Sequence, residues 1–423
     1  MIDQPQGLGA NKALNIGIVN AWGSNRGDEA MLSSLLHYLK SLDMNVQTTV
    51  YVNNRVDLKR FANVETKPWL KLDRLFPKTP KKIRQMRGLI GLLFPPALQP
   101  QAQQFFAHDF VISSPAGPYL GDLKPQSEWL CLLQLAICNS NRVPFGILAT
   151  SAGPFLNQRR NIIRKAILKN AAFWTVREPV SLSHLSELPI QIDKSMGSDL
   201  VFAHPSSSLG EFLAPTELDK FNAVLKKLEE KPFIVVVLNK TSFFDVDGNV
   251  VPFDPSSYIP KMGGLLKHAI DKTGCKLLII PHFYGDSLEE YLTKKIAEFT
   301  QKTDWIEVLD SGYNAEAQMY LYKQAEFAIS HRYHPTIFAA KAECPFLCIR
   351  HQFKVDGMLQ MFDNPGPVAN TTDSVEKWIE AFDEAWRCRD QIKAQIQAHL
   401  PNVINLSLKH LEILGNHLRK VQK

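Results

Sequence analysis

The feature that most constrains the fold is a rhythm that repeats along the chain: a short apolar run, a polar or glycine-bearing segment, then a stretch with helical periodicity. The apolar runs that begin these units are Leu14–Val19, Phe110–Ile112, Pro144–Leu148, Phe233–Leu238, Lys276–Ile280 and Glu326–Ser330, with a last run at Phe346–Ile349. Strands joined through helices run parallel, and their crossovers are right-handed. The sequence therefore predicts an α/β fold with parallel sheets.

The rhythm pauses between Ala203 and Glu217, where prolines, serines and a glycine crowd together. Because 423 residues are too many for one ordinary core, we expect two Rossmann-like domains that face each other across a cleft. The expected divisions are a flexible N-terminus at 1–12, a first domain at 13–205, a linker and connecting helix at 206–230, a second domain at 231–372 and C-terminal helices at 373–423.

Positive charge is concentrated in one part of the first domain. The net charge is +6, but residues 55–87 hold eleven Lys or Arg against three acids, hence +8, so the other residues sum to −2 (+6 minus +8). Large apolar side chains are interleaved with these cations and continue to Phe94, a mixture that suits a membrane surface or an anionic polymer. Segment 55–94 therefore either contacts a membrane surface or an anionic polymer, or is a solvated insertion. No recognised nucleic-acid module accompanies it, so nucleic acid is not an expected partner.

The chain shows no sign of export or of a membrane span. Its first dozen residues lack the apolar core of a secretory signal, and its apolar runs are far shorter than the roughly 18 residues needed to cross a bilayer. The six cysteines form no CxxC pair and no disulfide framework spacing. This usage fits a reducing compartment, so we expect a cytoplasmic protein.

Ligands of open parallel sheets bind beyond the carboxyl ends of the strands, and the densest polar cluster at such a place is His331-Arg332-Tyr333-His334-Pro335. Pro335 predicts a helix that starts near it, with His334 about at the cap. A helix start binds anions through free backbone N–H groups, and the Arg332 guanidinium suits a phosphate or carboxylate. His334 is then a candidate proton donor. The alternative is that His331 and His334 cap the helix and Arg332 pairs with an acid.

The loop Asn25-Arg26-Gly27-Asp28 opens the first helix. Gly27 permits a tight turn or a close backbone approach, and Asp28 is a good N-cap. Helix capping alone would explain Asp28, while contact with a ligand is the functional alternative. The loop is not a G-x-G-x-x-G fingerprint, so it does not indicate a dinucleotide.

Several short motifs, taken in order, resemble those of the polysaccharide pyruvyl transferase family. They are Asn25-Arg-Gly-Asp28 with Ala30, Ser151-Ala-Gly-Pro-Phe155, Arg177-Glu-Pro-Val-Ser181, Gly197-Ser-Asp199, Arg332-Tyr-His334 with Ile337-Phe-Ala339, and Phe353-Lys354 with Gly357-Met358. No single motif is decisive, but the ordered set spans roughly residues 15–360 and is specific.

The chain departs from the family pattern in three places. Tyr333 stands where leucine is usual, and Pro115-Ala-Gly117 replaces a Gly-Gly pair beside the second strand. Asn239-Lys240 follows the first strand of the second half, where many members have an arginine. Lysine keeps the charge but loses the bidentate fork of a guanidinium.

The resemblance implies a two-lobed architecture similar to that of GT-B glycosyltransferases. It also implies transfer of a pyruvyl group from phosphoenolpyruvate to sugar hydroxyls of a cell-surface polysaccharide or its lipid-linked precursor, forming a ketal. Phosphoenolpyruvate is then the donor substrate, and neither a cofactor nor a metal ion is expected. Because such acceptors are often assembled on lipid carriers, segment 55–94 could hold the enzyme at the inner face of the membrane.

On this reading, each candidate residue has an expected role. His334 is the acid that protonates the enol carbon, and the base is either Asp28 or His282. The residues expected to bind the donor are Arg332, Lys354, Lys240 and His331, because phosphoenolpyruvate brings about three negative charges. The residues expected on the loop and acceptor side are Asn25, Gly27, Gly153 and Arg177.

Two other functions are compatible with the sequence. A GT-B glycosyltransferase that uses a nucleotide sugar would share the architecture, and its diphosphate could also lie at the helix start by Arg332. A catalytically inactive scaffold in a glycan-assembly complex would use segment 55–94 for binding.

Overall fold

The computed structural model describes residues 13–23, 25–52, 58, 61, 63–69, 78–94, 107–115, 120–123, 125–205, 211–244, 250–352 and 354–422. The N-terminus 1–12, expected to be flexible, lies outside the described residues, as does part of segment 55–94. Ala116 and Gly117 of the Pro115-Ala-Gly117 segment, and Phe353, also lie outside the described residues.

The first domain is built on a seven-stranded sheet in which every pair of neighbouring strands is parallel. Its order is β3-β2-β1-β4-β5-β6-β7. The strands are β1 (Leu14–Ala21), β2 (Val46–Val52), β3 (Val64–Pro68), β4 (Phe110–Ser113), β5 (Phe145–Thr150), β6 (Trp174–Val176) and β7 (Lys194–Met196). The helices of this part are α1 (Arg26–Ser41), α3 (Lys81–Leu93), α4 (Pro125–Ser140), α5 (Gln158–Leu168), α6 (Pro179–Glu187) and the 3-10 turn η3 (Leu200–Ala203). Edge strand β3 lies within segment 55–94, so part of that segment belongs to the sheet.

The second domain has a six-stranded parallel sheet of order β12-β11-β8-β13-β14-β15. The strands are β8 (Phe233–Val237), β11 (Lys276–Ile279), β12 (Ile306–Val308), β13 (Phe327–Ser330), β14 (Phe346–Arg350) and β15 (Val368–Asn370), and a separate hairpin pairs β9 (Phe243–Phe244) with β10 (Val250–Val251). The helices are α7 (Pro215–Leu228), α8 (Pro255–Thr273), α9 (Ser287–Thr300), α10 (Ala315–Tyr322), α11 (Tyr333–Lys341), α12 (Lys354–Gln360), α13 (Val375–Arg387), α14 (Arg389–Gln422) and the 3-10 turn η5 (Thr303–Trp305). The predicted α/β class with two parallel-sheet domains is confirmed.

Buried side chains alternate between the two faces of the first sheet, as the pleat of a strand requires. Ile16 and Ile18 of β1 belong to a core cluster that continues through α1, η3 and α14 into the second domain, whereas Val19 packs with α4 on the opposite face. The two domains therefore share one continuous apolar core on the side of α1 and α14.

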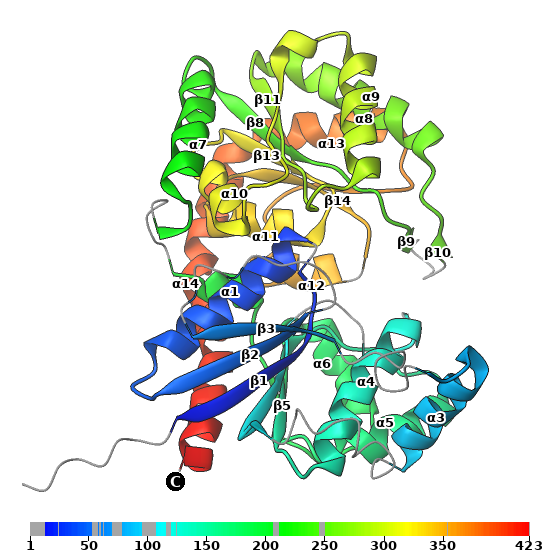
Figure 1. The fold of residues 1–423 in the computed structure, drawn as a ribbon. Coiled ribbons are helices and arrows are strands. Elements are labelled where there is room, and N and C mark those ends of the chain that lie inside the picture. Colours follow the sequence, from blue (N-terminus) through cyan, green and yellow to red (C-terminus); the bar gives the residue numbers. More distant parts are fainter. Residues whose placement is uncertain are drawn as a thin grey trace, which may run out of the picture.

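Helix α14 joins the C-terminal end of the chain to the first domain. It begins after α13 of the second domain and runs down beside the first sheet (Figure 1). Ser407 and His410 of α14 bond to the backbone carbonyls of Asp199 and Ser198, at 3.0 and 2.8 Å. The loop that precedes η3 is thus held by the last helix.

Candidate active site

The carboxyl ends of the two sheets meet. In each sheet the strand order reverses direction once, between β1 and β4 in the first and between β8 and β13 in the second, and ligands of such sheets bind at this point. Asn25 after β1 forms an isolated β-bridge with Phe283, and the backbone N–H of Arg26 donates to the carbonyl of His282 at 3.0 Å. The loops that follow β1 and β11 are therefore in direct contact, and the candidate residues lie around them.

Helix α11 begins two residues earlier than the sequence indicates. Its first residue is Tyr333 and its N-cap is Arg332, whereas the sequence predicts a start near Pro335 with His334 about at the cap. Proline is tolerated throughout the first turn because those N–H groups have no partner within the helix, so Pro335 did not fix the first residue. His334 therefore lies inside the first turn of α11 and is not its N-cap.

Helix α1 is capped by Asn25 and not by Asp28. The Asn25 side chain accepts a hydrogen bond from the Asp28 backbone N–H at 2.8 Å, and its amide donates to the Asp28 carboxylate at 2.5 Å. Asn and Asp are about equally good N-caps, so residue type alone could not choose between them. Asp28 lies in the first helical turn with 9% of its surface exposed, near the junction of the domains.

Gly27 is required by the close approach of α1 to α11. A methyl group at this position would overlap the imidazole ring of His334. His334 is 6% exposed and its Nε2 lies 3.3 Å from the Met31 sulfur of α1. The glycine thus lets an imidazole of the second domain lie against the first helix of the first domain.

The motif residues of the first domain form one buried network beside His334. Arg177 donates to Ser151 at 2.9 Å and to Asp199 at 2.7 Å, and its Nη1 lies 3.4 Å from His334 Nε2. The Asp199 carboxylate is 3.7 Å from the same imidazole nitrogen. Burial raises the pKa of the Asp199 carboxyl, and the Arg177 charge opposes that rise. These segments, far apart in the sequence, therefore converge on His334.

Two cations lie over the ring of Tyr333. The Arg177 guanidinium is 4.7 Å from the ring centroid and the Lys354 ammonium is 4.8 Å from it. Glu178, which is buried and accepts a 2.5 Å hydrogen bond from Ser181, adds a carboxylate to this group. A tyrosine in place of the usual leucine thus provides an aromatic face for both cations.

A second group of cations surrounds Phe283. Arg332 and Lys240 lie 4.6 and 3.9 Å from its ring centroid, and Lys240 also pairs with Asp286. The Arg332 Nε donates to the carbonyl of Leu238 at 2.9 Å. The structure therefore divides the expected donor-binding residues: Arg332 and Lys240 are at Phe283, while Lys354 is at Tyr333.

His282 and His334 connect the two groups. Their rings stack with centroids 6.4 Å apart, and the backbone N–H of His282 donates to Glu289 at 2.9 Å. Burial first, and then the Arg177 and Lys354 charges, hold the pKa of His334 well below its ordinary value. Burial, followed by the Arg332 and Arg26 charges, does the same for the pKa of His282. Both imidazoles are therefore neutral at physiological pH in the protein without ligand.

His331 occupies a different place from Arg332 and His334. Its Nδ1 lies 3.2 Å from the Tyr258 hydroxyl, which itself accepts from the Asn239 N–H. Its Nε2 lies 2.8 Å from the Thr371 hydroxyl, which donates to the Arg350 carbonyl. Because the Thr371 hydroxyl donates its hydrogen to a carbonyl, its oxygen accepts from His331 Nε2–H. The ring is therefore assigned as neutral and protonated at Nε2, and both of its nitrogens are hydrogen-bonded to the protein.

Gly153 lies in the loop after β5. It has a φ of +81°, its N–H donates to Leu120, and a methyl group there would overlap His184. The position therefore favours glycine for both conformation and space, through contacts with neighbouring loops and α6 of its own domain.

Arg26 is a residue whose importance the sequence analysis missed. It is fully buried, pairs with Glu29 at 3.5 Å, lies over the ring of Tyr284 and donates to the carbonyl of Ser311. Tyr284 and Ser311 belong to the second domain, so Arg26 crosses the junction. The sequence offered no signal for this role, because a charged residue beside a helix cap ordinarily faces solvent.

Comparisons with known proteins identify the family and the fold of the chain. The model of the family Polysaccharide pyruvyl transferase matches residues 25–352. No curated protein sequence matches the chain significantly. Among solved structures, UDP-GlcNAc 2-epimerase from Neisseria meningitidis, bound to UDP-GlcNAc, is 12% identical with a TM-score of 0.60 over 95% of this chain and 99% of that chain. A glycosyltransferase from Rickettsia africae ESF-5 is 14% identical with a TM-score of 0.57 over 97% and 100%. HepE from Anabaena, in complex with UDP-glucose, is 10% identical with a TM-score of 0.56 over 95% and 100%.

At these identities the solved structures show the fold alone, which is the GT-B arrangement of glycosyltransferases and epimerases. The family match is of a different kind, because it includes the Asn25–Asp28 loop, the Arg177 network and the Arg332–His334 segment. The chain belongs to the polysaccharide pyruvyl transferase family.

Proposed function

We propose that the protein transfers a pyruvyl group from phosphoenolpyruvate to two hydroxyls of a sugar, forming a ketal and releasing phosphate. The acceptor would be a cell-surface polysaccharide or its lipid-linked precursor. Membership of the family supports a transferase of this kind, and the donor and the ketal chemistry are the proposal.

The observation that carries the proposal is a set of buried N–H and O–H donors around His334 that lack a protein acceptor. Within the described residues, Nη2 of Arg332 and Nη2 of Arg177 have no hydrogen-bond partner, and neither has the hydroxyl of Tyr333. A buried polar group left in this state costs about 1–3 kcal/mol. An anion with several oxygens, placed at the start of α11, would satisfy these donors, and phosphoenolpyruvate carries both a phosphate and a carboxylate.

The reaction needs one proton delivered to carbon. Protonation of the methylene carbon gives the adjacent carbon oxocarbenium character. A sugar hydroxyl then adds there and gives up its proton, the C–O bond to phosphate breaks, and the second hydroxyl adds with loss of its own proton. His334 would deliver the first proton, and Asp28 or His282 would accept one from a hydroxyl. Because the His334 imidazole is neutral without ligand, the negative charge of the donor must raise its pKa before it can act as the acid.

Donor binding can be tested by thermal unfolding with phosphoenolpyruvate and with a panel of nucleotide sugars. We expect phosphoenolpyruvate to stabilise the wild type by about 2.7 kcal/mol at a hundredfold excess over its dissociation constant. Arg332→Ala should lose most of this shift. Arg387→Ala is the control, because that exposed arginine pairs with Glu384 of its own helix. Stabilisation by nucleotide sugars and not by phosphoenolpyruvate would replace the proposal with a glycosyltransferase.

We also propose that the protein contacts an anionic membrane through α3. The described residues 78–94 contain five cations and no acid. Ile83, Met86, Ile90 and Phe94 are 44, 56, 46 and 62% exposed. At 100° per residue these four side chains fall within about 80° of one another, so they form one apolar stripe. Amphipathic helices of this composition lie in the interface of anionic bilayers.

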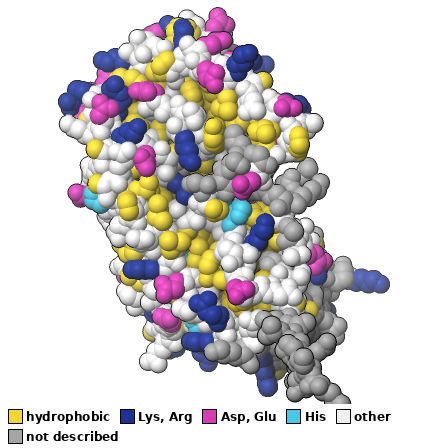
Figure 2. Space-filling model, turned by 90° about the vertical axis from the view of Figure 1, so that its left-hand side faces the viewer, with side chains coloured by type: hydrophobic (Ala, Val, Ile, Leu, Met, Phe, Trp, Pro, Cys, Tyr) yellow, Lys and Arg dark blue, Asp and Glu magenta, His cyan; other side chains and the backbone are white. Residues whose placement is uncertain are grey.

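The neighbouring helix supports the same surface. Helix α5 packs against α3 (Figure 1) and also contains no acidic residue. Ile162 of α5 is 70% exposed and Leu156 before it is 73% exposed. The opposite side of the protein differs, because Figure 2 shows Lys, Arg, Asp and Glu side chains interspersed over it. None of the helices in the described ranges has the length and apolar content of a membrane span.

The membrane contact can be tested by co-sedimentation with vesicles that contain anionic lipid. Wild type should bind at low salt and dissociate above about 0.2 M salt, where surface attraction is screened. Reversal of Lys78, Lys81, Lys82 and Arg84 to glutamate should abolish binding. The control reverses four exposed lysines of α7 and its flank, Lys220, Lys226, Lys227 and Lys231. Both variants change the net charge from +6 to −2 (+6 minus 8), so equal loss in both would show that net charge, and not the α3 surface, is responsible.

A further inference from the structure

A cluster of metal-ligand side chains lies outside the site described above. His37 of α1, His204 directly after η3 and Glu316 in the first turn of α10 each offer one ligand atom, and these atoms lie within 4.8 Å of one another. His204 and Glu316 are 4% exposed. Helix α1 belongs to the first domain and α10 to the second, so the cluster joins the domains near the point where the chain passes from one to the other.

The donor set selects a class of ion. Two imidazoles and one carboxylate are a ligand set found around zinc, whereas magnesium and calcium prefer oxygen ligands alone. Other first-row divalent ions that accept imidazole would also suit it. We propose that His37, His204 and Glu316 bind one divalent transition-metal ion, with zinc as the representative, at the junction of the two domains.

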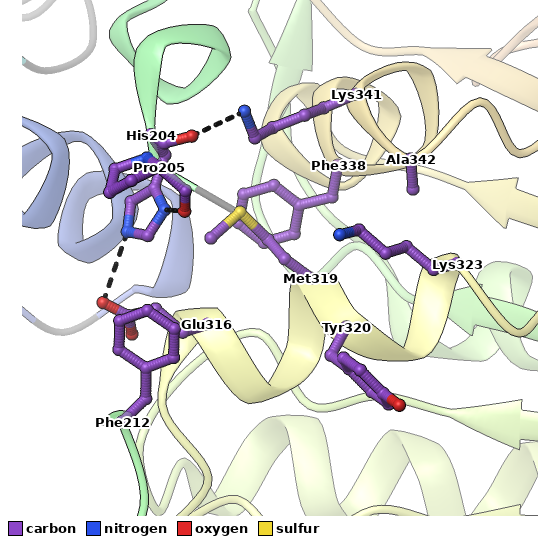
Figure 3. Close-up of a pocket in the computed structure, with 10 residues that line it drawn as sticks. All are labelled: His204, Pro205, Phe212, Glu316, Met319, Tyr320, Lys323, Phe338, Lys341 and Ala342. Carbon is purple, nitrogen blue, oxygen red and sulfur yellow. Dashed lines mark hydrogen bonds and ion pairs between the residues drawn. The ribbon is translucent and has the colours of Figure 1, made fainter. Parts of the chain in front are cut away.

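The orientation of His204 supports the proposal. Its Nδ1 lies 2.8 Å from the carbonyl of Pro205, and a carbonyl only accepts, so this nitrogen carries a proton. Figure 3 shows the ring turned with its other nitrogen toward Glu316, and this Nε2 is 3.5 Å from the carboxylate. A backbone carbonyl that fixes the far nitrogen is the usual way in which a protein orients a metal-binding histidine.

The Ser33 hydroxyl connects two of the three proposed ligands. The Ser33 hydroxyl donates its hydrogen to Glu316 at 2.5 Å, and its oxygen lies 3.1 Å from His204 Nε2. With its proton on Nδ1, that Nε2 presents a lone pair to two oxygens. A bound cation at this place would be coordinated by that lone pair and by the carboxylate.

The space is suitable for a metal ion with an additional water ligand. Ligand atoms about 2.0–2.1 Å from zinc in a tetrahedron stand about 3.3 Å apart, close to the separation of His204 and Glu316. His37 is half-buried, with its ring 5.3 Å from that of His204, and the ligand atoms, now within 4.8 Å of one another, have to approach by up to about 1.5 Å. His204 and Glu316 also line a cavity of about 50 Å³, large enough for a water.

Lys323 and Lys341 line the same cavity, and their positive charges repel a metal ion bound there. Lys341 donates to the carbonyls of Phe202 and His204 at 2.9 Å, and Figure 3 shows its ammonium approaching the His204 backbone and not the imidazole. Burial first, and then the Lys323 charge, lowers the pKa of Lys341 to about 8.

The test is metal binding by the whole chain, which does not depend on the proposed activity. Protein stripped of metal is titrated with Zn²⁺ in competition with a chromophoric chelator, and Co²⁺ is added separately to record visible d–d absorption. We expect one equivalent to bind. His37→Gln, His204→Gln and Glu316→Gln should each weaken binding at least tenfold and lose the Co²⁺ band. Circular dichroism confirms that each variant is folded.

Two control variants identify the site. His399→Gln, on α14, should bind like the wild type. His282→Gln removes a member of the other histidine pair and should also leave binding unchanged. The proposal is overturned if the wild type binds no equivalent, if the three ligand variants retain wild-type affinity, or if His282→Gln abolishes binding. If His204→Gln does not fold, the His37 and Glu316 variants decide.

Discussion

Gly27→Ala separates two opposing effects of one methyl group. In an exposed helix, alanine is favoured over glycine by up to about 1 kcal/mol. At Gly27 the new methyl would overlap the His334 ring, which is buried between α1 and α11. Overpacking of this kind typically costs about 1–3 kcal/mol. Subtracting the gain in helix propensity from the cost of the overlap, we expect a net loss of up to about 2 kcal/mol in the free energy of unfolding.

The measurement is urea denaturation of the wild type and the variant at one pH. Gly264→Ala is the matched control, because that helical glycine has one atom near the added methyl, Val375 Cγ2 at 3.1 Å at the end of a side chain that can move. Its expected effect is between zero and a gain of about 1 kcal/mol. The two substitutions share residue type and helical backbone and differ in the neighbour that the methyl meets.

A double-mutant cycle assigns the loss to His334. In the His334→Ala background most of the overlap is gone, so Gly27→Ala should cost at least about 1 kcal/mol less than it does in the wild type. The reasoning is refuted if Gly27→Ala stabilises the wild type as it would an exposed helix. It is also refuted if the two substitutions are additive, since the methyl would then act on some other group.

Three further predictions concern protons and charges. Affinity for phosphoenolpyruvate should fall as the pH rises, by at most about tenfold per pH unit, because binding raises the lowered pKa of His334 and takes up a proton. Calorimetry in buffers of different ionisation enthalpy should show this uptake in the wild type and not in His334→Asn. Burial lowers the pKa of His410 to about 4. The contribution of the neutral ring to the free energy of unfolding is therefore present above pH 6.5, and about 3 kcal/mol is lost as the pH falls toward 4. In urea denaturation at different pH values, His410→Gln should flatten this part of the profile. Asp199→Asn removes the ion-pair partner of the buried Arg177 and should lower the free energy of unfolding by about 3–5 kcal/mol. Glu384→Gln, at the exposed pair with Arg387, should change it by less than about 1 kcal/mol in the same denaturation assay.

The sheets could be predicted from the sequence because strand, loop and helix follow one another locally. Runs such as Phe233–Leu238 and Glu326–Ser330 are recognisable by their apolar residues and by the polar segments that follow them, and the rule on carboxyl ends then places Arg332 and His334 at the edge of a sheet. The helix starts were less accurate, because Pro335 is tolerated at several positions of a first turn, and because Asn25 and Asp28 are about equally good N-caps.

Contacts between distant segments could not be predicted in the same way. No local pattern shows that Arg26 reaches Ser311, or that Lys240 and Lys354 lie beside different aromatic rings. His331 has the same residue type and neighbourhood as His334, and only the positions of Tyr258 and Thr371 distinguish them. Hydrophobic periodicity predicts on which face of its own helix or strand a residue lies. The contacts of these residues depend on which other helix or strand packs against that face.

The attachment of α14 to the Asp199 loop has a consequence for the order in which the enzyme is assembled during synthesis. Ser407 is made 208 residues after Asp199, which at about 5–20 residues per second is a delay of about 10–40 s. During this interval the first domain can form its sheet, but the loop that carries the partner of Arg177 has no helix to hold it. The buried Arg177–Asp199 ion pair beside His334 therefore gains the support of α14 only after this delay, and a nascent chain that stalls before α14 lacks that support.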